Sequence, residues 1–261
     1  MGTGPIPEPV TAKPAIGLVA ALPVELRCLT SLSIQRNIPL LCGKQLVCVV
    51  SGIGAGNSKR AVEKLVSLGF APHALISWGT AGAIQTGLQP GDLLIPDNVQ
   101  TSDGTGLKTC TAARVLLREL LQGNAVTVHD GSLQEVKNVI STVTDKQALA
   151  RNTDAVAVDM ESAELGRIAE TRGIPFLVIR TIVDDASQAI PEAVTRTIDE
   201  CGNVRVLSLA KELFFKPALV MALFRLSRAM HLACKTLEIV ATKTDKLSQV
   251  TDTMLASASR G

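Results

Sequence analysis

A chain of 261 residues, 46% of them apolar, is long enough for one large α/β domain with an appendage and a sizeable core. Its net charge of only +2 argues against a nucleic-acid-binding protein, because such proteins present a basic face to the phosphate backbone. Its six cysteines form no Cys-x-x-Cys pair and its three histidines lie far from them, so we expect no metal site.

The first elements alternate between strand and helix. Residues 1–14 are rich in Pro and Gly and are expected to be disordered. Short apolar runs bounded by turn residues predict buried strands at residues 15–22, 45–51 and 74–78. Residues 58–68 are predicted to form a helix between the second and third of these strands.

A run of small residues, Gly-Thr-Ala-Gly at 79–82, follows the third strand and is predicted to form a turn. A short strand is expected at 92–95. Residues 112–121 are predicted to be helical, because their leucines recur at the spacing of one helix face.

The last core elements are a strand at 155–158, a helix at 161–171 and a strand at 175–183. Strands that alternate with helices are typical of an α/β sandwich with a largely parallel or mixed sheet. We therefore predict one domain over residues 15–202.

The chain changes character from about residue 203. Between residues 203 and 246, eight Lys and Arg stand against three acids and are interleaved with Leu, Met and Phe. This pattern predicts a basic amphipathic helical extension over 203–242, broken at Pro217. The extension either packs on the core as a cap, or forms a surface that touches anionic lipid or covers an apolar ligand. Residues 243–261 are polar and are expected to be a loose tail.

Ligands of α/β sheets bind at the carboxyl ends of the strands, so the residues that follow each strand are candidates for a site. Glu25 follows the first strand, and a glycine-rich turn at 52–57 follows the second. The segments 158–162 and 180–184 end the last two strands with acidic residues. Each has a simpler explanation when taken alone, since acids are favourable at helix starts and glycines are common in tight turns.

The turn at 52–57 nearly matches a dinucleotide-binding fingerprint. Asn57, however, stands where a third glycine belongs, and the nearest acid, Glu63, is too close in sequence. The turn also lacks the Gly-Lys-Ser/Thr ending of a nucleoside triphosphate loop, and the chain has no Gly-x-Ser-x-Gly elbow of a serine hydrolase. We therefore expect no cofactor.

Taken together and in this order, the strand-end segments resemble the nucleoside phosphorylase superfamily, and most closely its methylthioadenosine/adenosylhomocysteine nucleosidases. The segments are Glu25, Ser-Gly-Ile-Gly at 51–54, Gly-Thr-Ala-Gly at 79–82, Val-Asp-Met-Glu-Ser at 158–162 and Arg-Thr-Ile-Val-Asp at 180–184. The resemblance covers roughly residues 15–186. It implies a three-layer α/β/α sandwich with a central mixed sheet, followed here by a C-terminal helical extension.

The C-terminal part of the chain is similar to one particular group within this superfamily. The run from Asp184 to Pro191 and the basic, leucine-rich C-terminus are similar to the hopanoid-associated phosphorylases, which are proposed to remove adenine from adenosylhopane. This implies a lipid-linked adenine nucleoside as substrate.

The resemblance implies three catalytic carboxylates. Asp184 would protonate N7 of adenine, because the adenine anion is a poor leaving group and a buried acid with a raised pKa can supply a proton near neutrality. Glu161 would hold the ribose hydroxyls near the developing oxocarbenium ion, with Met160 packed under the sugar. Glu25 would activate the attacking water.

The resemblance also implies a set of substrate-binding residues. They are Thr80, Ala81, Gly82, Asp159, Met160, Arg180, Thr142 and Val143, the last two placed beside the base. The chain departs from the nucleosidases in having Val183 where they carry a serine. It also lacks their aromatic purine-stacking residue between Gly131 and Ala155.

The nucleophile is open between water and phosphate. A phosphate site needs an arginine and backbone N–H groups, for which Arg27, Gly52, Gly54 and Thr80 are the candidates. The phosphorylases place an arginine where this chain has Glu25, and a carboxylate there repels phosphate. The sequence therefore favours hydrolysis.

Three functions compete. The first is release of adenine from a lipid-linked nucleoside, the second is the same reaction on soluble methylthioadenosine or adenosylhomocysteine, and the third is a non-catalytic nucleoside-binding module. The combination of Glu25, Glu161 and Asp184 argues against the third. We expect a cytoplasmic homo-oligomer, a dimer or larger, whose C-terminal helices lie peripherally on the inner membrane if the first function holds.

Overall fold

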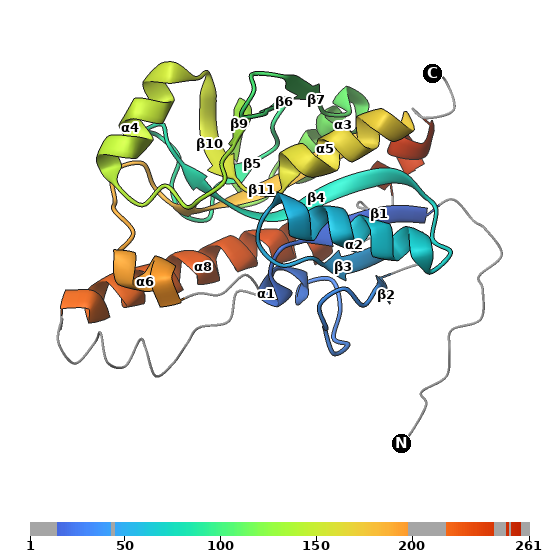
Figure 1. The fold of residues 1–261 in the computed structure, drawn as a ribbon, viewed down its shortest axis with the longest axis horizontal. Coiled ribbons are helices and arrows are strands. Elements are labelled where there is room, and N and C mark those ends of the chain that lie inside the picture. Colours follow the sequence, from blue (N-terminus) through green and yellow to red (C-terminus); the bar gives the residue numbers. More distant parts are fainter. Residues whose placement is uncertain (1–14, 43–44, 198–217, 243–248, 251, 257–261) are drawn as a thin grey trace.

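The computed structural model describes residues 15–42, 45–197, 218–242, 249–250 and 252–256. In this part of the chain, an 11-stranded mixed sheet lies between two layers of helices (Figure 1). The architecture is the expected three-layer α/β/α sandwich with a C-terminal helix. The predicted disorder of residues 1–14 and the predicted helix over 203–217 lie outside the described residues.

Four parallel strands form the centre of the sheet. They are β1 (Ala15–Ala20), β3 (Leu46–Val50), β4 (Pro72–Ala83) and β11 (Phe176–Asp184). β1 pairs with β3 and β4, and β4 pairs with β11 along most of its length. β10 (Ala155–Asp159) joins the far end of β4 in the antiparallel direction. These strands read as nearly continuous apolar runs because both faces of the sheet are covered.

Two cores, one on each face of the sheet, fill the space between the layers. Alternate residues of β1 point to opposite faces, so Ile16 and Leu18 belong to one core and Val19 to the other. The first core is covered by α3 (Thr111–Leu121) and α8 (Ala218–Thr242), the second by α2 (Ala55–Ser67) and α5 (Ser162–Arg172).

Shorter elements complete the described fold. The strands are β2 (Leu40–Leu41), β5 (Leu93–Leu94), β6 (Asn98–Gln100), β7 (Gly106–Lys108), β8 (Val128–His129) and β9 (Ser132–Glu135). The helices are α1 (Pro23–Leu26), α4 (Val143–Asn152) and α6 (Glu192–Thr197). Most of these strands were not predicted, because strands of two to four residues carry too little periodicity to be recognised.

The predicted turn at 79–82 is wrong, since β4 continues through these residues to Ala83. The small residues serve close approach instead. A Cβ on Gly79 would lie 2.6 Å from Oε1 of Glu25, and one on Gly82 would lie 2.8 Å from Oδ1 of Asp184. Glycine at these two positions lets both carboxylates press against the backbone of β4.

The C-terminal part of the chain belongs to the core. Leu237 and Val240 of α8 are buried with the first core, so this part of the extension packs on the domain. The expectation of a loose tail over residues 243–261 is wrong for the residues described there, because Val250 and Met254 are completely buried. Among the described residues, no helix is long and apolar enough to cross a membrane.

Candidate active site

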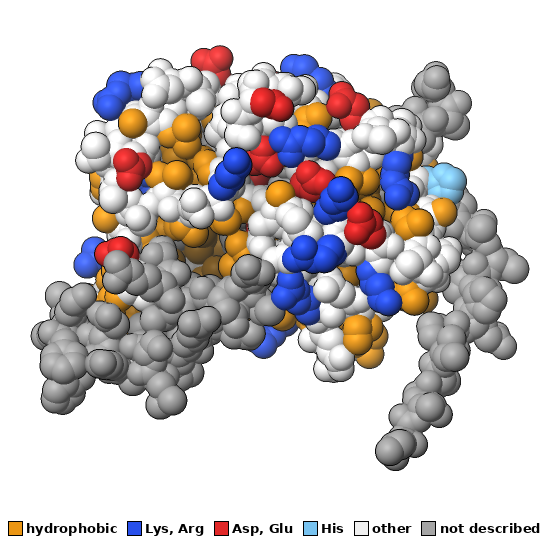
Figure 2. All heavy atoms as spheres, in the orientation of Figure 1, with side chains coloured by type: hydrophobic (Ala, Val, Ile, Leu, Met, Phe, Trp, Pro, Cys, Tyr) orange, Lys and Arg blue, Asp and Glu red, His pale blue; other side chains and the backbone are white. Residues whose placement is uncertain are grey.

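One cavity of about 790 Å³ collects the predicted strand-end residues. Its walls come from the C-terminal ends of β4, β10 and β11, the residues that follow β1, the start of α2, and α8. Seen from outside, hydrophobic side chains gather in a hollow below α4 (Figure 2). The cavity is therefore a pocket between the carboxyl ends of the strands and the C-terminal helix α8. Ligands of α/β sheets are expected to bind at this end of the strands.

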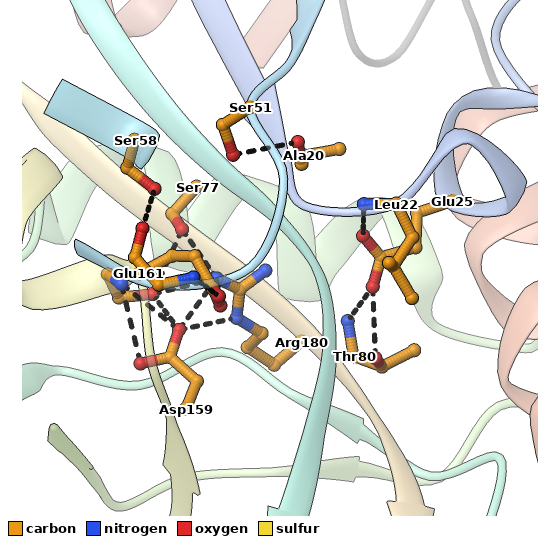
Figure 3. A network of polar contacts seen from close by, with 12 residues as sticks. Ala20, Leu22, Glu25, Ser51, Ser58, Ser77, Thr80, Asp159, Glu161 and Arg180 are labelled. Atoms are coloured by element: carbon orange, nitrogen blue, oxygen red, sulfur yellow. Dashed lines mark hydrogen bonds and ion pairs between the residues drawn. The ribbon is translucent and has the colours of Figure 1, made fainter. Parts of the chain in front are cut away.

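Glu25 is held rigidly at one side of the cavity. Its Oε1 accepts hydrogen bonds from the Thr80 backbone N (2.8 Å) and Oγ1 (2.9 Å), and its Oε2 accepts one from the Leu22 N at 2.9 Å (Figure 3). Its carbonyl oxygen accepts a hydrogen bond from Nε1 of the buried Trp78. Burial raises the pKa of the Glu25 carboxyl, and the charge of Arg180 opposes this rise.

Glu161 lies on another wall, at the start of α5. Its Oε1 accepts a hydrogen bond from the Gly54 N at 2.7 Å, and its Oε2 lies 3.9 Å from Nη2 of Arg180 (Figure 3). Burial, together with the nearby charge of Asp159, raises the pKa of the Glu161 carboxyl to about 7, and the charge of Arg180 opposes this rise. A carboxyl with this pKa can change its protonation state near neutral pH.

Arg180 lies beneath the cavity floor and organises the acids above it. Its Nε and Nη2 donate to Oδ2 of Asp159 at 2.8 and 2.6 Å, and its Nη2 also donates to the Ser77 Oγ at 2.7 Å. Ser162 donates to Asp159 as well. The guanidinium is almost completely buried, so its fixed positive charge offsets the negative charge of Asp159 and of Glu161.

Asp184 ends β11 and lies beside Gly82, its partner on the neighbouring strand β4. Its Oδ2 accepts a hydrogen bond from Nζ of Lys146, a residue of α4 whose side chain is completely buried. Burial raises the pKa of the Asp184 carboxyl, and the charge of Lys146 opposes this rise.

Most of the predicted site residues line this one cavity. They are Glu25, Gly54, Thr80, Ala81, Gly82, Asp159, Met160, Glu161 and Asp184. Gly52 and Arg180 do not line it, although Arg180 contacts residues that do.

Three predicted residues lie elsewhere. Thr142 and Val143 do not line the cavity, because Thr142 caps the N-terminus of α4 by accepting a hydrogen bond from the Asp145 N. The preceding residues, Val136–Ile140, form that wall instead. Arg27 is exposed at the end of α1 and does not line the cavity either, so the predicted phosphate contact has no support.

Sequence reasoning missed three basic residues near the site, one of which is Lys137, a residue that lines the cavity. Arg60 of α2 lines the cavity and donates to Asn57. Lys146 reaches Asp184. The pattern Thr-x-x-Asp at 142–145 could have indicated the start of α4. Nothing in the local sequence, however, indicates that Lys146 is buried.

Similarity to known sequences covers most of the chain. The sequence model of the phosphorylase superfamily matches residues 34–212. The chain is 31% identical over 169 residues to the 5′-methylthioadenosine/S-adenosylhomocysteine nucleosidase of Listeria welshimeri. This alignment covers 57% of this chain and 72% of the relative. It is 26% identical over 198 residues to the nucleosidase of the same name from Shewanella halifaxensis, covering 66% and 84%.

Solved structures show the same fold. A mutant of the Helicobacter pylori nucleosidase with 5′-methylthioadenosine in its active site aligns with a TM-score of 0.63 at 18% identity, covering 89% of this chain and 100% of the other. The futalosine hydrolase of H. pylori aligns with a TM-score of 0.62 at 17% identity, covering 88% and 98%.

Proposed function

The chain belongs to the phosphorylase superfamily, and we propose on this premise that it is a purine nucleosidase that releases adenine from an adenine nucleoside. One observation carries the proposal: Glu25, Glu161 and Asp184, from three distant segments, line a single cavity. The nucleosidase names of its sequence relatives agree with this reaction.

Asp184 is the general acid of the proposed reaction. Its carboxyl is buried, which keeps the proton on it to higher pH than for an ordinary aspartate. The proton passes from Asp184 to N7 of adenine while the bond between N9 and C1′ breaks and its electrons move onto the purine. Adenine then leaves as a neutral molecule.

Glu161 and Met160 serve the sugar. Breaking the glycosidic bond leaves positive charge on C1′ and the ring oxygen, which a carboxylate beside the ribose stabilises. Glu161 also accepts hydrogen bonds from the ribose hydroxyls, and Met160 packs beneath the ring. Arg180 keeps Asp159 and Glu161 in place from below.

Water is the proposed nucleophile, with Glu25 as its general base. A carboxylate facing the cavity beside Thr80 accepts a proton from water and repels phosphate. Glu25 must be ionised to act and Asp184 must be protonated. Burial raises both pKa values. Activity should therefore fall as the pH drops through the pKa of Glu25, and again as the pH rises through the pKa of Asp184.

Measuring adenine release with and without phosphate tests this function. We expect release in phosphate-free buffer, no stimulation by phosphate, and a loss of about 10²–10³-fold in Glu25→Gln, because the amide cannot accept the proton of water. Thermal unfolding of the variant checks that it is folded.

A requirement for phosphate, with ribose 1-phosphate as a product, would contradict hydrolysis. The anion site would then include Arg60, which lines the cavity, rather than Arg27, which does not. An Arg60→Met variant should in that case raise the KM for phosphate.

The substrate that we propose carries an apolar 5′ group, and the lipid-linked nucleoside adenosylhopane fits this description. One end of the cavity is lined by Ile190, Val194, Leu226 and Met230, which we call the apolar arm. One to two turns earlier on α8, Val220, Met221 and Phe224 are exposed. These three residues share one helix face and lie near Arg225 and Arg228, a pattern that favours contact with anionic lipid.

A series of 5′-alkylthioadenosines of increasing chain length tests the apolar arm. Each methylene that becomes buried contributes about 0.8 kcal/mol, so kcat/KM should rise about fourfold per carbon until the arm is filled. Met230→Gln should reduce kcat/KM for the long-chain substrate about tenfold, because its amide is buried without a partner, and should leave the methylthio substrate nearly unchanged.

The matched control is Val115→Gln on α3, which changes an exposed apolar residue that does not line the cavity. Equal losses for short and long substrates in Met230→Gln would rule out the apolar arm and favour soluble methylthioadenosine or adenosylhomocysteine.

A further inference from the structure

Lys146 is a buried lysine with a complete set of acceptors. Its Nζ donates to Oδ2 of Asp184, to the carbonyl oxygen of Asp185 at 2.7 Å and to that of Gln188 at 3.1 Å. An ammonium group has three donors, and all three are used. Only 1% of the side chain is exposed, so water does not screen its charge from Asp184.

The two oxygens of Asp184 are in different surroundings. Lys146 binds Oδ2, whereas no donor from the described residues binds Oδ1. Oδ1 lies beside Gly82, where a Cβ would come within 2.8 Å of it. Gly82 and Asp184 both line the cavity. One oxygen is thus anchored, and the other is available to a ligand.

We propose that Lys146 is a positioning residue for the proton transfer to the purine: it anchors Oδ2 of Asp184, directs the proton-bearing Oδ1 at N7, and stabilises the carboxylate that remains. This inference rests on the proposed nucleosidase function. In the transfer, the proton leaves Oδ1 for N7 and the electrons of the N9–C1′ bond pass to the purine. Lys146 keeps its own protons throughout and supplies only hydrogen bonds and charge.

Lys146 also orders the loop that follows β11. Its contacts with the carbonyl oxygens of Asp185 and Gln188 tie this loop to α4. If Lys146 had only a structural role, its contacts with these two carbonyl oxygens would be enough, and they do not involve the side chain of Asp184. The third contact, with the proposed acid, is the one that bears on the chemistry.

The charges around Asp184 come from several elements. Asp185 on its own segment raises the pKa of Asp184, and Lys146 on α4 lowers it. Lys137 lines the main cavity, and Arg225 and Arg228 of α8 line a second cavity of about 370 Å³ that shares Asp184. Among the described residues, Lys146 is the cation that contacts the Asp184 carboxylate directly, so its removal should raise the pKa of Asp184 further.

The test compares Lys146→Met with Lys146→Arg and with the control Lys64→Met, which removes an exposed lysine of α2 that does not line the cavity. In Lys146→Met, we expect the basic limb of the kcat/KM profile to move up by about one pH unit or more, because the opposite charge is gone. The maximal rate should fall about tenfold, since a weaker and less oriented acid transfers its proton more slowly. Lys146→Arg should restore the position of the limb, and Lys64→Met should leave it unchanged.

A second measurement does not depend on turnover. Carbon-13 NMR of labelled aspartate, with Asp184→Asn to identify the signal, gives the pKa of Asp184 in the folded protein. An upward shift in Lys146→Met supports the inference even if the wild type releases no adenine, a result that would reject only the proposed function. An unchanged Asp184 titration in a folded Lys146→Met, or an unmoved pH profile in an active one, overturns the inference.

Discussion

The Asp184→Asn variant is expected to release adenine about 10³-fold more slowly than the wild type, within the range that general acid catalysis contributes. The amide has almost the same shape as the carboxyl group and can still contact the purine, but it has no acidic proton to give to N7. Without that proton the purine must leave as an anion. The loss should therefore appear in kcat, with a smaller change in KM.

The neighbouring carboxylate offers a matched control for this variant. The side chain of Asp185 accepts hydrogen bonds from the Ser187 N and Oγ at 2.7 and 2.6 Å, within its own loop. An amide oxygen can accept the same bonds, so Asp185→Asn should lose less than about tenfold. Similar rates for Asp184→Asn and the wild type would show that another group protonates the base.

The Arg180→Met variant is expected to lose about 3–5 kcal/mol of unfolding free energy, which makes it the largest stability effect that we predict. The arginine is 2% exposed and binds Asp159, itself buried, through two nitrogens. Methionine fills similar space but leaves the charge of Asp159 without a partner, and Glu161 lies beside it. Urea unfolding followed by circular dichroism measures the loss.

The loss in Arg180→Met should depend on pH in a defined direction. Burial already raises the pKa of Glu161 above its unfolded value in the wild type, and without the opposing charge of Arg180 this folded-state pKa rises further. The unfolded chain therefore ionises first as the pH increases, and the folded state loses stability between the unfolded and folded pKa values. The destabilisation should thus be smaller at pH 5 than at pH 8.

Two further variants sharpen the test of Arg180. Arg118→Met removes a more exposed arginine that pairs with Asp130, and should cost less than about 1 kcal/mol. The double variant Arg180→Met/Asp159→Leu should regain much of the lost stability, because no buried charge is left unpaired at that contact. A loss in Arg180→Met no larger than that in Arg118→Met would contradict the buried-pair explanation.

The sequence alone determined the strands of the central sheet and the acids at their ends. Strands β1, β3, β10 and β11 are short apolar runs, and such runs are recognisable because both faces of a covered sheet are apolar. Glu25 and Asp184 were found because each comes at or directly after such a run. Whether these residues act as the resemblance implies stays a prediction that the variants above test.

The tertiary structure decided what depends on partners distant in sequence. Gly79 and Gly82 look like a turn in the sequence, but they lie within a strand, where the absence of a Cβ leaves room for the carboxylates of Glu25 and Asp184. Lys146 looks like a solvent-exposed lysine, yet it is buried against the end of β11. Val250 and Met254 lie in a polar stretch and are still buried in the core. Local patterns encode the period of an element and the chemistry of its ends, whereas burial and close approach arise only when separate segments pack together.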